Sequence, residues 1–495
     1  MKDASLPVKL ASPIFKYLLA ALFVTVVFLS FLLKGSIILY IVLATPVIAL
    51  FLFILFQNPK FGIYSSLFIS FLIPTFTKFV YDLPYGLAIE TILILTYIVL
   101  FLKHFKEINL TPAKNIVVAL MFIWMAYIVL QLANPEAKSV IAWAYAMRGI
   151  ALFQLLLIPL VFILLKTKRD LTQFIVFYFA LSIIGFIWAA KQHQLGLTEA
   201  ESQYLYNSGA AKTHLLFGKL RVFSIYFDAG TFGAVAGQVC IISALLILGP
   251  FKKLYKYIFL IIALFAFYGM MVSGTRGALA IPAVGTIVYV ILIKNIRYII
   301  VGLTILIFGF VFLKFTTIGH SSYDIRRLRS ALDPKDASLN VRLENREKLT
   351  EYLKGKPFGG GVGSVGAIGL QFSPNTWLAN FPPDGLYTRI RAETGIVGYC
   401  IYLFIWLLIL YKGFRICWNL KNPTYKSLAT AFLASYAGVL VSNYGNEVMT
   451  QYPINYATFI TLAFIFIIKK WDDQAQHLHQ AADSSTEKKS LPSAY

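Results

Sequence analysis

Long apolar runs recur from one end of the chain to the other, and they restrict its fold more than any other feature. The 495 residues are 59% hydrophobic and 13% charged, whereas soluble domains are about 25% charged. Many runs approach the roughly 20 residues that a helix needs to cross a bilayer, and they are continuous instead of alternating with polar residues. Because only helices and closed barrels satisfy every backbone polar group in lipid, the sequence predicts an all-α polytopic integral membrane protein.

We expect about 14 transmembrane helices from this length criterion. The predicted spans cover residues 16–33, 36–56, 61–80, 85–102, 115–132, 149–165, 171–190, 228–249, 254–272, 277–293, 298–314, 391–411, 427–445 and 453–468. The short connection after every second span is rich in lysine and arginine, and the positive-inside rule places such connections in the cytoplasm. Both termini then face the cytoplasm.

The spans divide the chain into five regions. These are N-terminal transmembrane helices at 1–190, a central transmembrane region with arginines at its outer helix ends at 191–314, a large outer loop at 315–390, C-terminal transmembrane helices at 391–470 and a cytoplasmic tail at 471–495. The tail has little apolar surface, so we expect it to be disordered. The net charge of +22 is scattered between the helices, which argues against a nucleic-acid partner.

Two connections, at 191–227 and 315–390, are too long to be turns, and both fall on the outer side. Beside them, Arg276 lies in the stretch VSGTRGALAIP and Arg221 begins the stretch RVFSIYFDAGTFG. An arginine at a helix end can reach the lipid headgroups at modest cost. Alternatively, its planar guanidinium matches the oxygens of a phosphate. Asp228 is more simply a helix N-cap than a catalytic group.

The large outer loop carries further candidates. Residues 338–357 have the pattern of an amphipathic helix from which Arg342 and Arg346 project together. The following run KPFGGGVGSVGAIG contains Gly360 and Gly361. It lacks the Gly-Lys-Ser/Thr of a nucleotide P-loop, which leaves either an anion-binding nest of backbone N–H groups or a flexible turn.

Four ionisable residues crowd the entrance to the span that follows this loop. They are Asp384, Arg389, Arg391 and Glu393, in the stretch PPDGLYTRIRAETGIVG. Glu393 and Arg389 are spaced as an ordinary i,i+4 pair, yet four charges at a helix entrance also support a functional hypothesis. The sequence has no Cys/His cluster with metal-ligand spacing, so we expect neither a metal nor a cofactor.

The order of these stretches resembles the O-antigen polymerase and O-antigen ligase superfamily of bacterial membrane glycosyltransferases. The similarity covers roughly residues 215–410 and rests on RVFSIYFDAGTFG, SGTRGAL, the arginine-bearing helix, PFGGGVG and DGLYTRIRAETGIVG in that order. The resemblance implies a GT-C-like helical fold in the bacterial inner membrane, a periplasmic active face and an undecaprenyl-diphosphate-linked oligosaccharide as donor. It also implies a glycan acceptor, with a chain-length regulator or a flippase as further partners.

Within this resemblance, Arg221 and Arg276 fall where the family places arginines that contact the donor diphosphate. The ligase branch has a histidine as the presumed base at the position of Asp384, and this departure favours a polymerase of O-antigen, capsule or exopolysaccharide repeat units over a ligase that modifies lipid A core. His320 in the same loop is an alternative base. The predicted catalytic residues are Asp384, Arg276, Arg221 and Glu393, and the predicted substrate-binding residues are Arg342, Arg346, Arg389, Arg391, Tyr387, His320, Gly360 and Gly361.

The chemistry also follows from the residues. Outside the cytoplasm a glycosyl transfer needs a donor that already carries its leaving group, and arginines with preorganised hydrogen bonds can stabilise the departing anion. A carboxylate, Asp384 or Glu393, would take the proton of the acceptor hydroxyl, with inversion at the anomeric carbon. The rivals are a lipid-linked oligosaccharide flippase, which should show internal repeats and charges deep within its spans, and a non-catalytic assembly partner.

Overall fold

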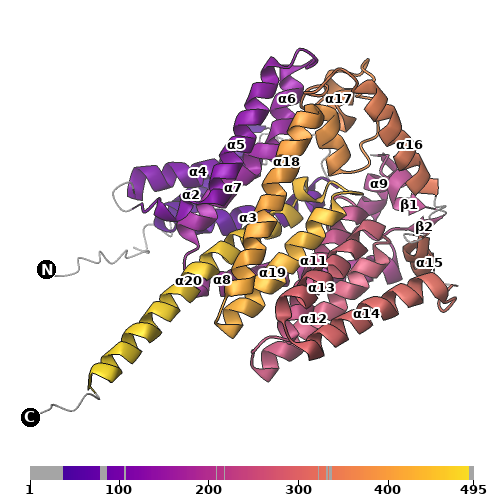
Figure 1. Cartoon of the computed structure of the whole chain (residues 1–495). Helices are drawn as coiled ribbons and strands as arrows, with labels where there is room; N and C mark the ends of the chain where they lie inside the picture. The colour runs from indigo at the N-terminus through magenta and orange to yellow at the C-terminus, as the bar shows by residue number, and fades with distance from the viewer. Residues whose placement is uncertain are drawn as a thin grey trace, which may run out of the picture.

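The fold is an assembly of helices, seen in a computed structural model that describes residues 37–78, 86–104, 108–207, 209–216, 218–320, 323–330, 333 and 337–489 (Figure 1). The first half of the described chain forms α2 (Ile37–Gln57), α3 (Lys60–Phe76), α4 (Gly86–His104), α5 (Ile116–Leu130), α6 (Val140–Met147), α7 (Phe153–Leu164), α8 (Lys168–Leu195), α9 (Glu199–Asn207), α10 (Ala211–His214) and α11 (Ala229–Ile247). The second half forms α12 (Lys253–Val272), α13 (Arg276–Ile293), α14 (Ile296–Phe315), α15 (Tyr323–Arg329), α16 (Ala337–Tyr352), α17 (Gly366–Phe372), α18 (Leu386–Asn419), α19 (Pro423–Ser442) and α20 (Ile454–Lys489). A two-stranded antiparallel ribbon, β1 (Leu215–Leu216) with β2 (Lys219–Leu220), precedes α11.

The predicted all-α membrane class is confirmed. Among the described residues, ten helices are long and apolar enough to cross a membrane, and Thr45–Gln57 and Lys60–Phe76 are shorter apolar helices. Each predicted span from 36–56 onward contains a helix, while the span predicted at 16–33 lies outside the described residues. The span predicted at 149–165 begins earlier than expected, because α6 and α7 join through a π-helical turn at Arg148–Leu152 into one segment, Val140–Leu164.

One prediction is wrong at the C-terminus. Residues 471–489 continue α20 as a helix, so the disorder expected for 471–495 does not hold there, and 490–495 lie outside the described residues. The reason is that no glycine or proline occurs between Pro453 and Pro492, and such residues are the usual stop signals for a helix. Figure 1 shows α20 running beyond the other helices.

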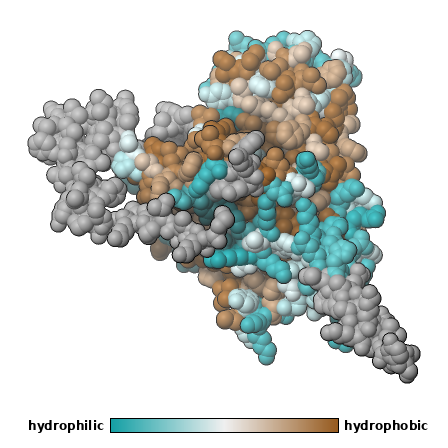
Figure 2. All heavy atoms as spheres, turned by 90° about the vertical axis from the view of Figure 1, so that its left-hand side faces the viewer, coloured by the Kyte–Doolittle hydropathy of each residue, from teal (hydrophilic) through white to brown (hydrophobic). Residues whose placement is uncertain are grey.

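Burial separates central helices from lipid-facing ones. In the most apolar window of α11, 83% of the residues are buried, against 6% in α14. Large hydrophobic side chains such as Ile305, Ile307 and Phe308 on α14 are exposed, as expected for a surface in contact with lipid tails. Figure 2 shows one face of the molecule, on which hydrophobic surface is extensive and hydrophilic side chains gather in a separate area.

The connections collect at two opposite ends of the assembly. At the basic end, Lys60 and Asp170 form an ion pair of 2.6 Å and the Trp471 indole donates to the Lys166 carbonyl at 3.0 Å. At the other end, which we call the loop end, Arg221 of the first long connection and Arg327 of the second contact the same turn, 273–276, and Arg346 of the second contacts Tyr444 in the connection 443–453. The two long connections therefore lie at the same end of the molecule, as the sequence predicted.

Candidate functional site

Three helices, α11, α13 and α18, begin at the loop end. The Ser442 hydroxyl donates to the Gly277 carbonyl at 3.0 Å, and the Leu386 N–H lies 3.1 Å from the carbonyl of Asn443. The Asn446 side chain lies between Gly277 of α13 and Gly230 of α11, and a side chain added at Gly277 would displace it. The N-terminus of each helix carries partial positive charge, so the convergence of three such ends favours an anionic ligand.

Three half-buried arginines surround the turn 273–276 between α12 and α13. Arg327 donates through Nε to the Gly274 carbonyl at 2.6 Å, and Arg221 donates through Nη2 to the Thr275 hydroxyl at 3.0 Å. Arg276, the first residue of α13, donates through Nη1 to the Ser330 hydroxyl at 3.1 Å. The structure therefore brings the two predicted arginines together and adds Arg327, which the sequence reasoning missed.

Arg327 lies on α15, whose sequence YDIRRLR carries three arginines within seven residues. That density was the signal that could have identified it. Arg326 on the same helix turns away and donates to the His320 carbonyl at 2.9 Å, and Arg329 donates to the Ile318 carbonyl at 2.6 Å. Of the three arginines on α15, Arg327 alone contacts the turn that precedes α13.

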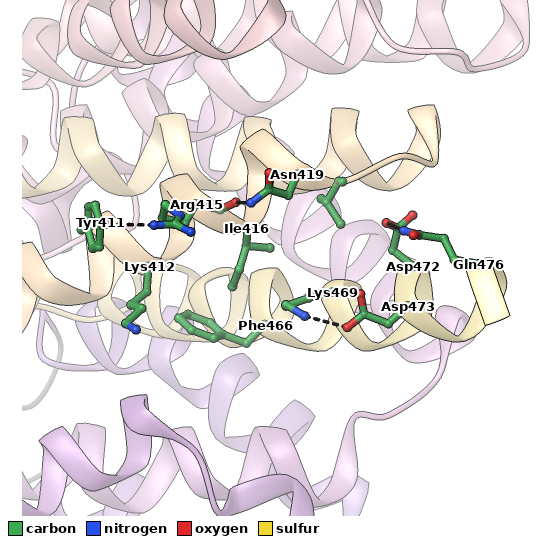
Figure 3. A pocket seen from close by; sticks show the side chains of 11 residues that line it. Tyr411, Lys412, Arg415, Ile416, Asn419, Phe466, Lys469, Asp472, Asp473 and Gln476 are labelled. Carbon is green, nitrogen blue, oxygen red and sulfur yellow. Dashed lines mark hydrogen bonds and ion pairs between the residues drawn. The ribbon is translucent and has the colours of Figure 1, made fainter.

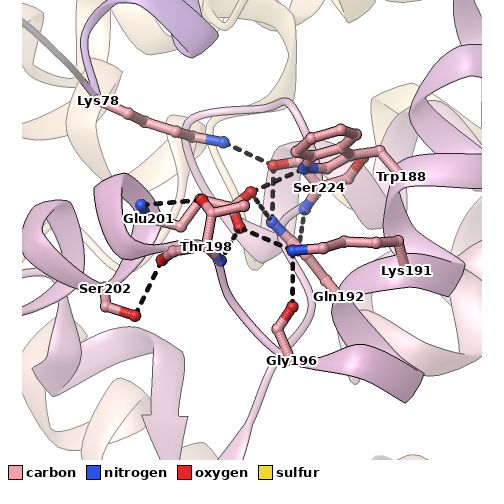
Figure 4. Close-up of polar contacts among 9 residues, drawn as sticks. All are labelled: Lys78, Trp188, Lys191, Gln192, Gly196, Thr198, Glu201, Ser202 and Ser224. Carbon is pink, nitrogen blue, oxygen red and sulfur yellow. Dashed lines mark hydrogen bonds and ion pairs between the residues drawn. The ribbon is translucent and has the colours of Figure 1, made fainter.

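A buried polar network fixes the segment that carries Arg221 (Figure 4). Ser224 is fully buried with a φ of 55°, and its N–H donates to Gln192 Oε1 at 2.7 Å. The Ser224 carbonyl accepts from Lys78 Nζ at 2.6 Å. Glu201 Oε1 accepts from the Trp188 indole and from Gln192 Nε2, which ties α8 to α9. Burial acts to raise the pKa of Glu201, but the hydrogen bond from the Thr198 N–H and those from Trp188 and Gln192 outweigh it and hold that pKa below its usual value.

Lys78, two residues beyond α3, makes the stability of this network depend on pH. Its burial disfavours the charged form, which the nearby Glu201 carboxylate only partly offsets, so the pKa of Lys78 is lowered to about 7. An unfolded chain holds this proton up to about pH 10.4. Between those pH values the unfolded state binds more protons than the native state, so the free energy of unfolding should rise with pH.

We expect Lys78→Met to flatten this rise between about pH 7 and pH 10, as measured by thermal unfolding across that range. Lys348→Met, at an exposed lysine of α16, serves as the control and should leave the slope unchanged. An equally steep rise in Lys78→Met would show that another group causes it.

The outer-loop helix α16 lies against the connection 443–447. The Arg346 guanidinium stacks 3.8 Å from the Tyr444 ring centre, and Arg342 lies against Gly445. Asn345 donates through Nδ2 to Asp384 Oδ2 at 3.1 Å. The amphipathic helix predicted at 338–357 is therefore present as α16, and its two arginines project toward the loop end as expected.

The remaining predicted site residues differ in their exposure and in the contacts that they make. Asp384 and Arg391 are half-buried, and among the described residues Arg391 has no ion-pair partner. The Tyr387 hydroxyl donates to the Leu440 carbonyl at 2.6 Å, which joins α18 to α19. His320 is exposed, and its carbonyl rather than its ring contacts α15. Asp228 caps α11 by accepting from the Thr231 N–H at 2.8 Å, so the N-cap interpretation is confirmed.

Arg389 is the centre of a buried ionic triad. Its Nε donates to Glu393 Oε1 at 3.1 Å and its Nη1 donates to Glu447 Oε2 at 2.8 Å. The Glu393 side chain is 0% exposed, so an acceptor sugar does not reach it in this structure and we assign it a structural role instead of a catalytic one. Glu447 was missed because it is distant in sequence and follows a predicted span.

The glycine-rich run packs against α18 instead of forming an open nest. The Gly360 N–H donates to the Ala392 carbonyl and the Gly361 N–H donates to the Glu393 carbonyl, both at 2.9 Å. These N–H groups are therefore not available to an anion. α18 is kinked at this point, where Gly395 has a φ of 67°.

We expect Gly395→Ala to destabilise the protein by about 2 kcal/mol or more, because alanine is strained at positive φ and its methyl group would collide with the Pro357 carbonyl. Thermal unfolding in one detergent measures the loss. Gly309→Ala in α14, where the added methyl group meets nothing within 4 Å, is the matched control. A loss no larger than that of Gly309→Ala would contradict the expectation.

Among the described residues, no group of three or more His, Cys, Asp or Glu side chains is placed to hold a metal ion. In comparisons with known proteins, residues 261–403 match the family model described as O-Antigen ligase. The match contains Arg276, Arg327, Asp384 and all of α16, and it confirms the resemblance to the O-antigen ligase and polymerase superfamily. No curated protein matches the chain.

Proposed function

We propose that this chain, which carries an O-antigen ligase domain at residues 261–403, is a polysaccharide polymerase of the bacterial inner membrane. It transfers glycan from an undecaprenyl-diphosphate-linked donor to a hydroxyl of an acceptor sugar, and the loop end faces the periplasm. The observation that carries the proposal is the set of three arginines around the turn 273–276, placed where three helices begin.

In this proposal, Arg221, Arg276 and Arg327 hold the donor diphosphate. The bond between the anomeric carbon and the diphosphate breaks as the acceptor oxygen attacks, and the guanidinium groups stabilise the charge that develops on the leaving group. Nδ2 of Asn446 is buried without a hydrogen-bond partner among the described residues, which supports a ligand at the helix N-termini because buried donors are normally paired. Inversion at the anomeric carbon follows from a single displacement.

Asp384 accepts the proton of the attacking hydroxyl, and Asn345 orients its carboxylate through the 3.1 Å hydrogen bond. Arg342, Arg346 and Arg391 line the approach of the glycan. Arg389 is occupied by two carboxylates, so it acts by fixing the start of α18 rather than by direct contact with the substrate.

The test uses the purified chain with lipid-linked repeat units. A ladder of products supports a polymerase, a single transfer to lipid A core would instead indicate a ligase, and the absence of any covalent product would indicate a transporter or an assembly partner.

We expect Asp384→Asn to lower the transfer rate by about 10²–10⁴-fold, the usual contribution of a general base. Because the carboxamide preserves the shape of the side chain, protein levels should not change. Glu344→Gln, at an exposed carboxylate one residue from Asn345, is the control and should retain the wild-type rate. A wild-type rate in Asp384→Asn would remove this residue from the mechanism.

A further inference from the structure

A pocket of about 620 Å³ opens at the basic end, between the last turns of α18 and the part of α20 that leaves the helix assembly (Figure 3). Its apolar wall includes Ile416 of α18 and Phe466 of α20, and its rim carries Lys412, Arg415 and Lys469. It lies at the opposite end from the arginines of the candidate active site, so the proposed glycan transfer does not use it.

The charges on the rim are only partly neutralised. Lys469 pairs with Asp473 at 2.6 Å. The carboxylate of Asp472 accepts from the N–H groups of Lys421 and Asn422, so it holds the turn between α18 and α19.

On the opposite side of the pocket the charges are not balanced. Within the described part of the chain, neither Lys412 nor Arg415 pairs with a carboxylate, and Arg415 donates only to the Tyr411 hydroxyl at 3.2 Å. Two cations spaced i,i+3 on one helix therefore face the same opening without a counter-ion.

The depth of the pocket matches that of lipid headgroups. The apolar run of α18 gives way to charge after Tyr411 and that of α20 after Ile468. The rim cations therefore stand just outside the hydrocarbon level, and Phe466 lies at its edge, three residues before Lys469. Connections at this end are the basic ones, which by the positive-inside rule places it in the cytoplasmic leaflet.

We propose that this pocket binds an anionic glycerophospholipid of the cytoplasmic leaflet. The lipid phosphate lies between Lys412 and Arg415, and an acyl chain leaves it across Phe466 toward the hydrocarbon. Basic pockets between transmembrane helices on this side are suited to acidic headgroups. A soluble anion would leave the apolar wall uncovered, which favours a lipid as the occupant.

The experiment compares the full chain in bilayer nanodiscs of phosphatidylcholine with and without phosphatidylglycerol. Native mass spectrometry counts the phosphatidylglycerol molecules retained after gentle release. In Lys412→Gln/Arg415→Gln we expect retention to fall by about tenfold or more, since each cation near the surface contributes to the attraction. Lys252→Gln/Lys253→Gln, at two exposed lysines on the same end of the molecule, should retain lipid as the wild type does.

Unchanged retention in the pocket variant would overturn the proposal, as would equal retention of phosphatidylcholine. Displacement of the lipid by millimolar glycerol phosphate would also overturn it, because the site would then belong to a soluble anion. If the double variant does not fold, the wild-type chain is photolabelled with a diazirine-bearing phosphatidylglycerol and the labelled segment is identified. Labelling of the segment 411–420 supports the proposal, and labelling only of other segments contradicts it.

Discussion

Replacing Arg276 by alanine is expected to lower the rate of glycan transfer by about 10²–10³-fold, the cost of removing one preorganised donor from a developing anion. The side chain stands at the first residue of α13 and is half-buried, so its charge acts in surroundings of lower dielectric than bulk water. Its guanidinium donates to the Ser330 hydroxyl, which in turn donates to the Arg327 carbonyl. Arg276→Ala therefore removes both the positive charge and the planar guanidinium group.

Arg276→Lys separates these two contributions, since lysine keeps the charge but loses the planar fork that binds two phosphate oxygens at once. We expect an intermediate rate for it. The measurement is product formation from lipid-linked repeat units at matched protein concentration. Arg326→Ala provides the control because Arg326 contacts only the His320 carbonyl in the described part of the chain. Wild-type polymer from Arg276→Ala would remove the central premise of the proposed mechanism.

The helical class was predictable because a membrane leaves a chain few options, and the apolar length of each span is readable from the sequence alone. Helix boundaries were less accurate where local rules compete. The π-helical turn at Arg148–Leu152 extended one span, and the absence of a stop signal after Lys470 let α20 continue.

The candidate site was predictable in part. Arg221 and Arg276 were identified because arginine is rare beside a span, and the structure places both at one turn. Arg327 and Asn446 were missed, since an arginine in a polar loop or an asparagine after a span is ordinary in sequence. The three arginines of YDIRRLR were a local signal for Arg327. Its contact with Gly274 and the contact of Asn446 with Gly277 join segments far apart in the chain, and no local pattern encodes those contacts.

We expect a second large effect, a loss of stability, when Arg389 is replaced by alanine. Arg389→Ala leaves the Glu393 carboxylate in a site that is 0% exposed and without its cation, and it also leaves Glu447 unpaired. Breaking a buried pair by removing one partner costs about 3–5 kcal/mol. We expect a large fall in the thermal unfolding midpoint and little folded protein in detergent.

The double variant Arg389→Met/Glu393→Leu tests whether the unpaired Glu393 carboxylate causes this loss of stability. It removes both buried charges and fills similar volume with apolar groups, a change that is often neutral for stability, while Glu447 keeps partial contact with solvent at 21% exposure. We therefore expect most of the lost stability to return. Transfer activity then decides the role of Arg389: recovery of activity along with stability means that the triad positions α18, whereas a stable but inactive double variant means that the guanidinium contacts the substrate.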